Sequence, residues 1–176
     1  RAGDGVISRG HLMHRFLLAL SFLSAFSFSP VYAASNGFFN NLAGKWSGSG
    51  QAYLPKLVEV SANCRLSITG GATQVAINGS CGLLVFRQSL GFTIRNSAGN
   101  SYVGTYTGSR TGQAKLEGTL QGNKLVMRIT WGGLVNGDRT AQMVLMRTGP
   151  NSFAQTVIDN VAGKTRSTSA FNFKRS

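Results

Sequence analysis

The chain is poor in the residues that carry out chemistry. Its 176 residues include two histidines (His11 and His14), two cysteines and five acidic side chains, against 18 lysines and arginines. Both histidines precede an N-terminal apolar run, so the chain beyond that run has none. Catalysis of the Ser-His-Asp or Cys-His type therefore lacks its base, and metal sites lack ligands. We expect no enzymatic activity, no metal site and no cofactor.

The carboxylates beyond the apolar run are Glu59, Glu117, Asp138 and Asp159, and no two are close in sequence. Glu117 is expected on the solvent face of a hairpin, and both aspartates in turns. A glycosidase pair built from Glu59 and a turn aspartate stays open but has no support.

The only long apolar run, FLLALSFLSAFSFS, spans residues 16–29. It follows Met13 and a short basic head, and it precedes PVYAAS, a small-x-small cleavage pattern. It is shorter than the roughly 20 residues that a spanning helix needs. We therefore expect a signal peptide at 13–34 cleaved near Ala33 or Ala34, a secreted or periplasmic protein, and no integral membrane protein.

Residues 1–12 are interpreted as translated upstream sequence or a remnant of cloning, outside the fold. Residues 35–176 are expected to form a single domain, since their number suffices for one hydrophobic core.

Negative charge is scarce from Ser35 onward, where 15 basic and 4 acidic side chains leave a net charge of +11. Such an excess favours an anionic partner. The charges are nevertheless scattered singly, and the only adjacent basic pair is Lys174-Arg175. This scatter argues against a nucleic-acid partner. An anionic envelope lipid or polysaccharide, and an ordinary soluble surface, both stay open.

Turn signals recur about every ten residues, and the runs between them are rich in β-branched and aromatic residues. No strong helical period follows the apolar run. This pattern predicts an all-β, antiparallel up-and-down barrel of about ten strands, with a two-sheet sandwich as the alternative. The expected strands begin near Lys45, Val58, Gln74, Val85, Tyr102, Gln113, Lys124, Arg139, Phe153 and Lys164.

One hairpin can be worked out in register. A two-residue turn at Gly122-Asn123 places Leu120 opposite Leu125, and Glu117 opposite Arg128. All the apolar side chains then share one face, whereas a slip by one residue would mix the two faces. One face is buried and the other is wet, which argues against a membrane barrel.

The two cysteines obey the same symmetry. Cys64 and Cys81 are equidistant from Ala72-Thr73 in the turn TGGAT, so they lie opposite each other on neighbouring strands. In a secreted chain this arrangement predicts a cross-strand disulfide.

The stretch LAGKWSGSG, residues 42–50, holds a Gly-x-Gly core. A phosphate loop would need a helix immediately after its glycines, and no helical pattern follows. The glycines are better interpreted as bends in a strand at a barrel corner.

The segment LAGKW resembles the Gly-x-Trp opening of lipocalins and the wider calycin group. The resemblance implies a structural role for Gly44 and for Trp46, which would close one end of the barrel beneath Arg147, Lys174 or Arg175. The opening and the cysteine hairpin also resemble a set of small secreted bacterial proteins. That second resemblance implies a bacterial envelope protein and no particular activity.

A barrel of this size either fills its interior with side chains or holds one small ligand. We expect a non-enzymatic protein that binds a small apolar or amphipathic ligand inside the barrel. Two alternatives stay open: a basic surface, including Arg87, Arg95 and Arg110, that binds an anionic envelope component, and a protein–protein or inhibitor role. The candidate ligand-binding residues, each of which could instead be ordinary core, are Tyr102, Tyr106, Met127, Trp131, Phe171 and Phe173.

Overall fold

The computed structural model describes residues 37–54, 58–83 and 85–176. The expected signal peptide and residues 1–12 lie outside these ranges. The described residues form ten strands and no helix: β1 (Gly44–Leu54), β2 (Val58–Gly70), β3 (Gln74–Leu83), β4 (Phe86–Ala98), β5 (Ser101–Tyr106), β6 (Ala114–Gln121), β7 (Lys124–Val135), β8 (Asp138–Gly149), β9 (Ser152–Val161) and β10 (Lys164–Arg175).

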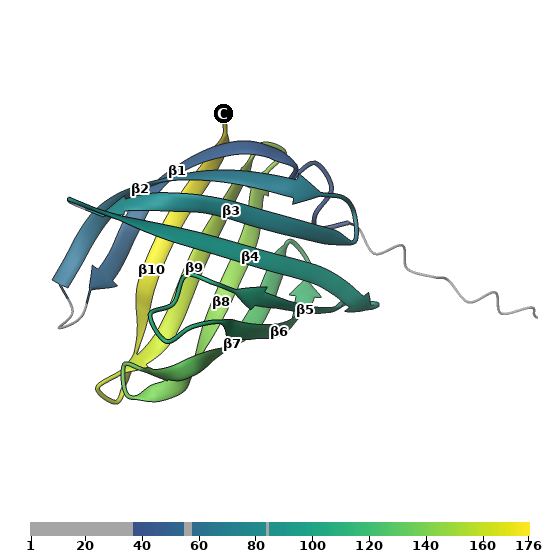
Figure 1. The fold of residues 1–176 in the computed structure, drawn as a ribbon. Helices are drawn as coiled ribbons and strands as arrows, with labels where there is room; N and C mark the ends of the chain where they lie inside the picture. Colours follow the sequence, from purple (N-terminus) through teal and green to yellow (C-terminus); the bar gives the residue numbers. More distant parts are fainter. Residues whose placement is uncertain (1–36, 55–57, 84) are drawn as a thin grey trace, which may run out of the picture. The chain divides into compact units, whose positions relative to one another are not determined.

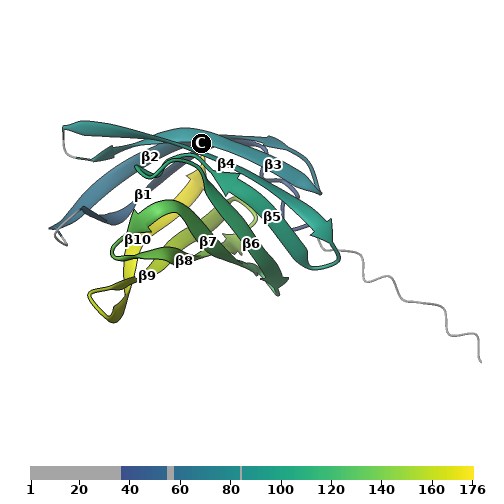
Figure 2. The same cartoon turned by 60° about the horizontal axis from the view of Figure 1, so that its bottom comes forward.

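Each strand pairs antiparallel with its neighbours in sequence, and β1 pairs with β10 to close the ring. Figures 1 and 2 show the strands following one another around the barrel in chain order. The prediction of an all-β up-and-down barrel is confirmed, and the sandwich alternative is wrong. A closed ring leaves no unpaired strand edge.

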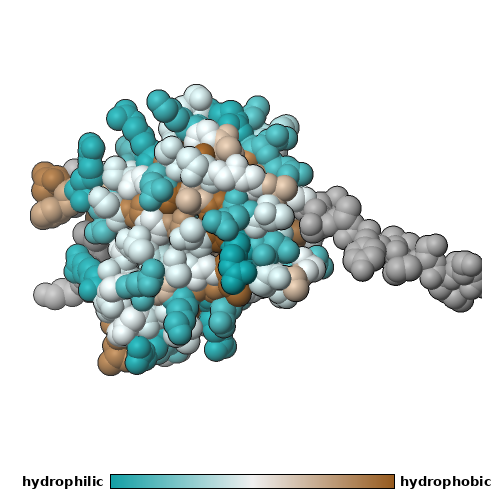
Figure 3. All heavy atoms as spheres, turned by 45° about the vertical axis from the view of Figure 1, so that its right-hand side comes forward, coloured by the Kyte–Doolittle hydropathy of each residue, from teal (hydrophilic) through white to brown (hydrophobic). Residues whose placement is uncertain are grey.

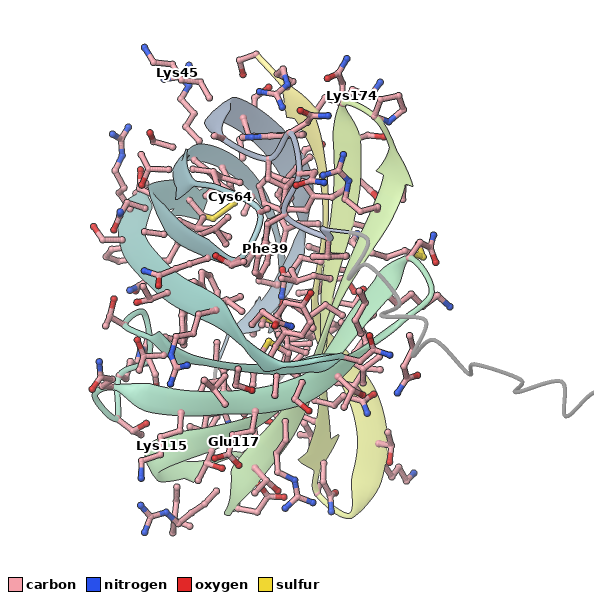
Figure 4. All side chains as sticks on the ribbon, turned by 90° about the vertical axis from the view of Figure 1, so that its right-hand side faces the viewer. Phe39, Lys45, Cys64, Lys115, Glu117 and Lys174 are labelled. Carbon is pink, nitrogen blue, oxygen red and sulfur yellow. A yellow bond between two sulfur atoms is a disulfide. The ribbon has the colours of Figure 1, made fainter. Side chains whose placement is uncertain are left out.

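The hairpin of β6 and β7 has the predicted register, with Leu120 opposite Leu125 and Glu117 opposite Arg128. Figure 4 shows Glu117 and Lys115 pointing away from the barrel. Each of the ten strands begins within one residue of its predicted start. The alternation of apolar and polar residues therefore determines both the pairing and the buried face.

The predicted disulfide joins Cys64 on β2 to Cys81 on β3, which are direct partners in the strand register. Both cysteines are buried and face the barrel interior. The bridge is compatible with an extracellular or periplasmic protein.

The N-terminal segment 37–43 makes a turn that closes one end of the barrel. Its side chains Phe38, Phe39 and Leu42 are buried, and Phe39 packs edge-on against Tyr102 with ring centroids 5.4 Å apart. Trp46 is 1% exposed, and its indole Nε1 donates to the Leu42 carbonyl at 2.8 Å. We call this the closed end.

Arg175 covers the outside of Trp46, with its guanidinium carbon 4.7 Å from the ring centroid. It donates to the Ala43 carbonyl at 2.7 Å and to the Asn41 carbonyl. Gly44 makes room for it, because an added Cβ would meet Arg175 Nη1. Of the three basic partners predicted for Trp46, Arg175 is therefore the one in contact.

The other two candidates lie nearby. Arg147 donates to the Asn40 carbonyl at 3.1 Å and to the Pro150 carbonyl at 3.0 Å. Its burial, and then the neighbouring charge of Arg175, lower the pKa of the Arg147 guanidinium. Lys174 is exposed and points outward (Figure 4).

Within residues 37–54, 58–83 and 85–176, no helix is long and apolar enough to cross a membrane.

Candidate ligand cavity

A cavity of about 820 Å³ occupies the barrel between Trp46 and the opposite end, which we call the open end. The turns at the closed end are residues 71–73, 99–100, 122–123 and 150–151. The connections at the open end include residues 107–113, 136–137 and 162–163. A volume of this size is typical of sites for small molecules. The barrel is thus hollow over much of its length.

The deep part of the cavity is apolar. Phe153 and Phe173 stack there at 4.7 Å, and Phe153 packs against Trp46 at 5.0 Å. The disulfide of Cys64 and Cys81 forms part of the same wall. An apolar molecule would therefore replace water against an apolar surface, which is favourable.

The Gly-x-Gly of the first strand has a packing role. An added Cβ at Gly48 would meet the ring of Phe173, because β1 and β10 run side by side at this level. The absence of a side chain at Gly48 thus leaves space for the Phe173 ring. Since the Gly-x-Gly lies within strand β1, it is not a phosphate-binding loop.

Asp159 is the only buried charged residue among those described, at 3% exposure, and it lines the cavity on β9. The sequence placed it in a turn, and that placement is wrong. Strand β9 continues to Val161, because every second residue faces inward: Phe153, Gln155, Val157, Asp159 and Val161. The turn follows at 162–163, where both φ angles are positive.

The Asp159 carboxylate accepts hydrogen bonds from Asn136 Nδ2 at 2.7 Å and from the Asn160 amide at 2.8 Å. Burial raises its pKa, the two hydrogen bonds oppose that effect, and the charge of Asp138 adds to it. This position brings one carboxyl group to the cavity wall.

Trp131, on β7, brings a polar hydrogen to the same cavity. It is 8% exposed, and its indole Nε1 has no hydrogen-bond partner among the described residues. A buried donor without a partner is costly, by about 1–3 kcal/mol. Near it, Tyr106 lies with its ring centroid 6.3 Å from that of Trp131, and burial raises the pKa of the Tyr106 phenol.

A segment we call the strap, residues 107–113, connects β5 to β6 and lines one side of the cavity. The Thr107 amide donates to the Gly91 carbonyl at 2.9 Å, and Gln88 Nε2 donates to the Gly108 carbonyl at 3.3 Å. On its other side the strap reaches Gly132, where an added Cβ would meet the Thr111 carbonyl.

Four of the six predicted binding residues line the cavity: Tyr106, Trp131, Phe171 and Phe173. Tyr102 and Met127 do not. They are fully buried beside the closed end, where Tyr102 packs on Phe39 and Met127 lies opposite Gly118 and Met143. Period-two alternation identifies inward positions, but it does not give their height along the barrel.

Carboxylates and cysteines do not gather anywhere in the described parts of the barrel. Within residues 37–54, 58–83 and 85–176, no group of three or more potential metal ligands occurs. Glu59 is exposed and accepts a hydrogen bond from the Tyr53 hydroxyl at 2.7 Å.

No protein-family model matches the chain. No curated protein matches it in sequence either. Among solved structures, it is similar to Rv2717c from M. tuberculosis, with 12% identity and a TM-score of 0.62 over 82% of this chain and 98% of that one. An S-type phycobiliprotein lyase from Guillardia theta matches more weakly, with 8% identity and a TM-score of 0.45 over 79% and 90% of the two chains. The likeness to Rv2717c supports the ten-stranded antiparallel barrel as a known architecture.

Proposed function

We propose that the protein is a non-enzymatic binding protein that holds one small amphipathic molecule in its barrel. The observation that carries the proposal is the cavity of about 820 Å³, whose deep wall is aromatic and aliphatic. In a barrel filled by its own side chains, the inward side chains would meet at the axis and leave no such cavity.

The ligand that suits this cavity has an apolar body and a hydrogen-bond acceptor. The apolar body would lie between the Phe153–Phe173 stack and the disulfide. The acceptor would satisfy Trp131 Nε1, which no described residue satisfies. A carbonyl or ether oxygen is such a group, and its hydrogen bond is worth about 0.5–1.5 kcal/mol, or roughly two- to tenfold in affinity.

The proposed setting is the periplasm or the extracellular space. The disulfide and the expected signal peptide support it, and so does the resemblance of LAGKW and the cysteine hairpin to small secreted bacterial proteins. Kinship with lipocalins is part of the same proposal and rests on the Gly-x-Trp opening.

The test of the cavity is a fluorescence titration with N-phenyl-1-naphthylamine, a dye that brightens in apolar surroundings. Val157 lies in the cavity wall on β9, and Val157→Trp would fill the space, so we expect dye affinity to fall at least tenfold. The matched control is Val126→Trp on the outer face of β7, since Val126 is not among the residues that line the cavity. Equal affinity in the wild type and in Val157→Trp would refute a cavity site.

The acceptor is tested by comparing 2-decanone with decane, which share an apolar chain and differ in one carbonyl. The chain contains two tryptophans, so its NMR spectrum has two indole N–H signals. We expect 2-decanone, and not decane, to move the Trp131 signal downfield. The Trp46 signal is an internal control, because its indole already donates to Leu42. Identical shifts with both compounds would contradict the acceptor.

A further inference from the structure

The open end of the barrel carries exposed apolar side chains. The exposed large hydrophobic residues among those described are Tyr53, Val58, Val85, Phe86 and Leu134. All five belong to the ends of strands or turns at the open end, on three separate hairpins. Val85 is 90% exposed, Phe86 70% and Leu134 68%. We call this set the rim.

An exposed set of this kind is informative, because large exposed apolar side chains that share one end of a molecule point to an interaction there. Figure 3 shows brown groups projecting at the left and lower left of a surface that is otherwise mostly teal and white. The closed end, by contrast, buries Phe38, Phe39 and Leu42. The rim is therefore a specialised end of the barrel.

Basic side chains accompany the rim. Arg87 and Arg110 line the same opening as Phe86 and Leu134. Lys164 and Arg166 begin β10 at this end and are exposed. Glu59 and Asp138 are the acidic residues at this end outside the cavity wall, so the described part of the open end is net positive. Arg95, which the sequence grouped with Arg87 and Arg110, lies eight residues further along β4, opposite Gln74 near the closed end.

Apolar tips beside basic side chains suit an anionic lipid bilayer. Each tip can enter the interfacial layer by itself, while the arginines remain with the headgroups. Pairing with a strand of another protein is not available to a closed ring. A rigid protein partner would need a continuous face of about 800 Å², whereas these side chains project from separate hairpins.

We propose that the rim docks onto an anionic membrane surface, with Val58, Val85, Phe86 and Leu134 in the interfacial layer and Arg87 and Arg110 at the phosphates. In this position the cavity opens toward the lipid. An amphipathic ligand can then pass between the bilayer and the cavity without crossing water. Only this last consequence rests on the proposed function.

The test is flotation with vesicles of phosphatidylcholine that contain or lack 30% phosphatidylglycerol. It uses the chain from Ser35, which holds all ten strands of the closed ring and lacks the apolar run 16–29, which would itself bind lipid. We expect binding to the anionic vesicles, weakened by added salt, and little binding to the neutral ones. Failure to bind the anionic vesicles would overturn the proposal.

Charge placement is tested by Arg87→Glu with Arg110→Glu, against Lys45→Glu with Lys174→Glu. The two double variants have the same net charge, and Lys45 and Lys174 lie at the closed end (Figure 4). We expect at least about tenfold weaker partitioning for the arginine pair and a several-fold smaller effect for the lysine pair. Equal effects would mean diffuse attraction and would refute a docking face.

Insertion of the tips is tested by Val58→Ser with Val85→Ser, because neither valine lines the cavity. We expect partitioning to fall about threefold or more while dye affinity stays unchanged. Undiminished partitioning would overturn insertion. If these changes instead split a dimer, and no vesicle binding occurs, the rim joins two copies of the chain and the proposal is wrong. If the wild-type protein binds anionic vesicles but does not bind the dye, the proposed cavity function is refuted and membrane docking is not.

Discussion

Arg175 shows how one side chain can hold one end of a barrel together. It stacks over Trp46 and donates to Asn151 Oδ1 at 3.1 Å, to the Ala43 carbonyl and to the Asn41 carbonyl. The planar guanidinium with its five donors is what allows all these contacts at once. Strand β10 and the N-terminal segment are therefore tied together through a single residue.

Replacing Arg175 by lysine tests this role. Lysine keeps the charge but loses the planar stacking and the fork of donors. We expect Arg175→Lys to lower the free energy of unfolding by about 1–3 kcal/mol, measured by urea denaturation. Lys174→Gln, one residue away and exposed, should change it by less than about 0.5 kcal/mol. A change in Arg175→Lys no larger than in this control would contradict the role.

Asp159 is a second residue whose effect can be isolated. Its pKa in the folded protein is raised above the ordinary value of 3.8. The folded state therefore binds this proton more tightly than the unfolded state does. Protonation of Asp159 therefore stabilises the folded state. This contribution is fully present below pH 3.8 and is lost as the pH rises through the folded pKa.

We compare the unfolding free energies of the wild type and Asp159→Asn between about pH 3.8 and the higher folded pKa of Asp159. As the pH rises through this window, we expect the wild type to lose stability relative to the variant. Urea denaturation at several pH values measures it. Glu117→Gln controls for the loss of one negative charge at an exposed position. A flat difference across that window would show that burial does not raise this pKa.

At the scale of elements, the strap is held between two strands. Gln88 on β4 anchors one side and Gly132 on β7 receives the other. At Gly132 an added Cβ would also lie 3.2 Å from the Gln113 carbonyl. The backbone of the strap approaches β7 more closely than any other residue type at position 132 would allow.

Gly132→Ala should therefore displace the strap. We expect a loss of about 1–3 kcal/mol in unfolding free energy from overpacking, together with several-fold faster release of N-phenyl-1-naphthylamine in stopped-flow dilution. Gly82→Ala on β3 is the matched control, since an added Cβ there would lie 3.8 Å from the Asn63 carbonyl, an ordinary contact. Release as slow as in the wild type would show that the position of the strap does not control release of the dye from the cavity.

The whole molecule combines a packed end and a hollow end in one ring of strands. The strand starts, the register of β6 and β7 and the Cys64–Cys81 bridge were all predictable, because hairpins are specified by residues close together in the chain. Trp46 was predictable as the plug, and Arg175 was among its predicted partners. These features depend on local turn chemistry and on period-two alternation.

The cavity residues were predictable only in part. Tyr106, Trp131, Phe171 and Phe173 line it, while Tyr102 and Met127 lie too close to the closed end. Asp159 was misplaced because DNVAG contains turn-forming residues, although the alternation runs through it to Val161. The rim was not predicted, because isolated apolar residues near turns carry no signal until the fold places their hairpins at the same end of the barrel.

By itself, the sequence determined that this chain forms antiparallel strands joined in chain order by hairpins, with one wet face and one cross-strand disulfide, because each of these follows from neighbours along the chain. The pairing of β1 with β10, which closes the ring and excludes a sandwich, came from the tertiary structure. Only the tertiary structure decided that the barrel is hollow and that Trp131 presents an unsatisfied donor to the cavity. It also decided that the exposed apolar side chains lie at the same end of the barrel. Those properties depend on the distance across the barrel between side chains of strands far apart in sequence.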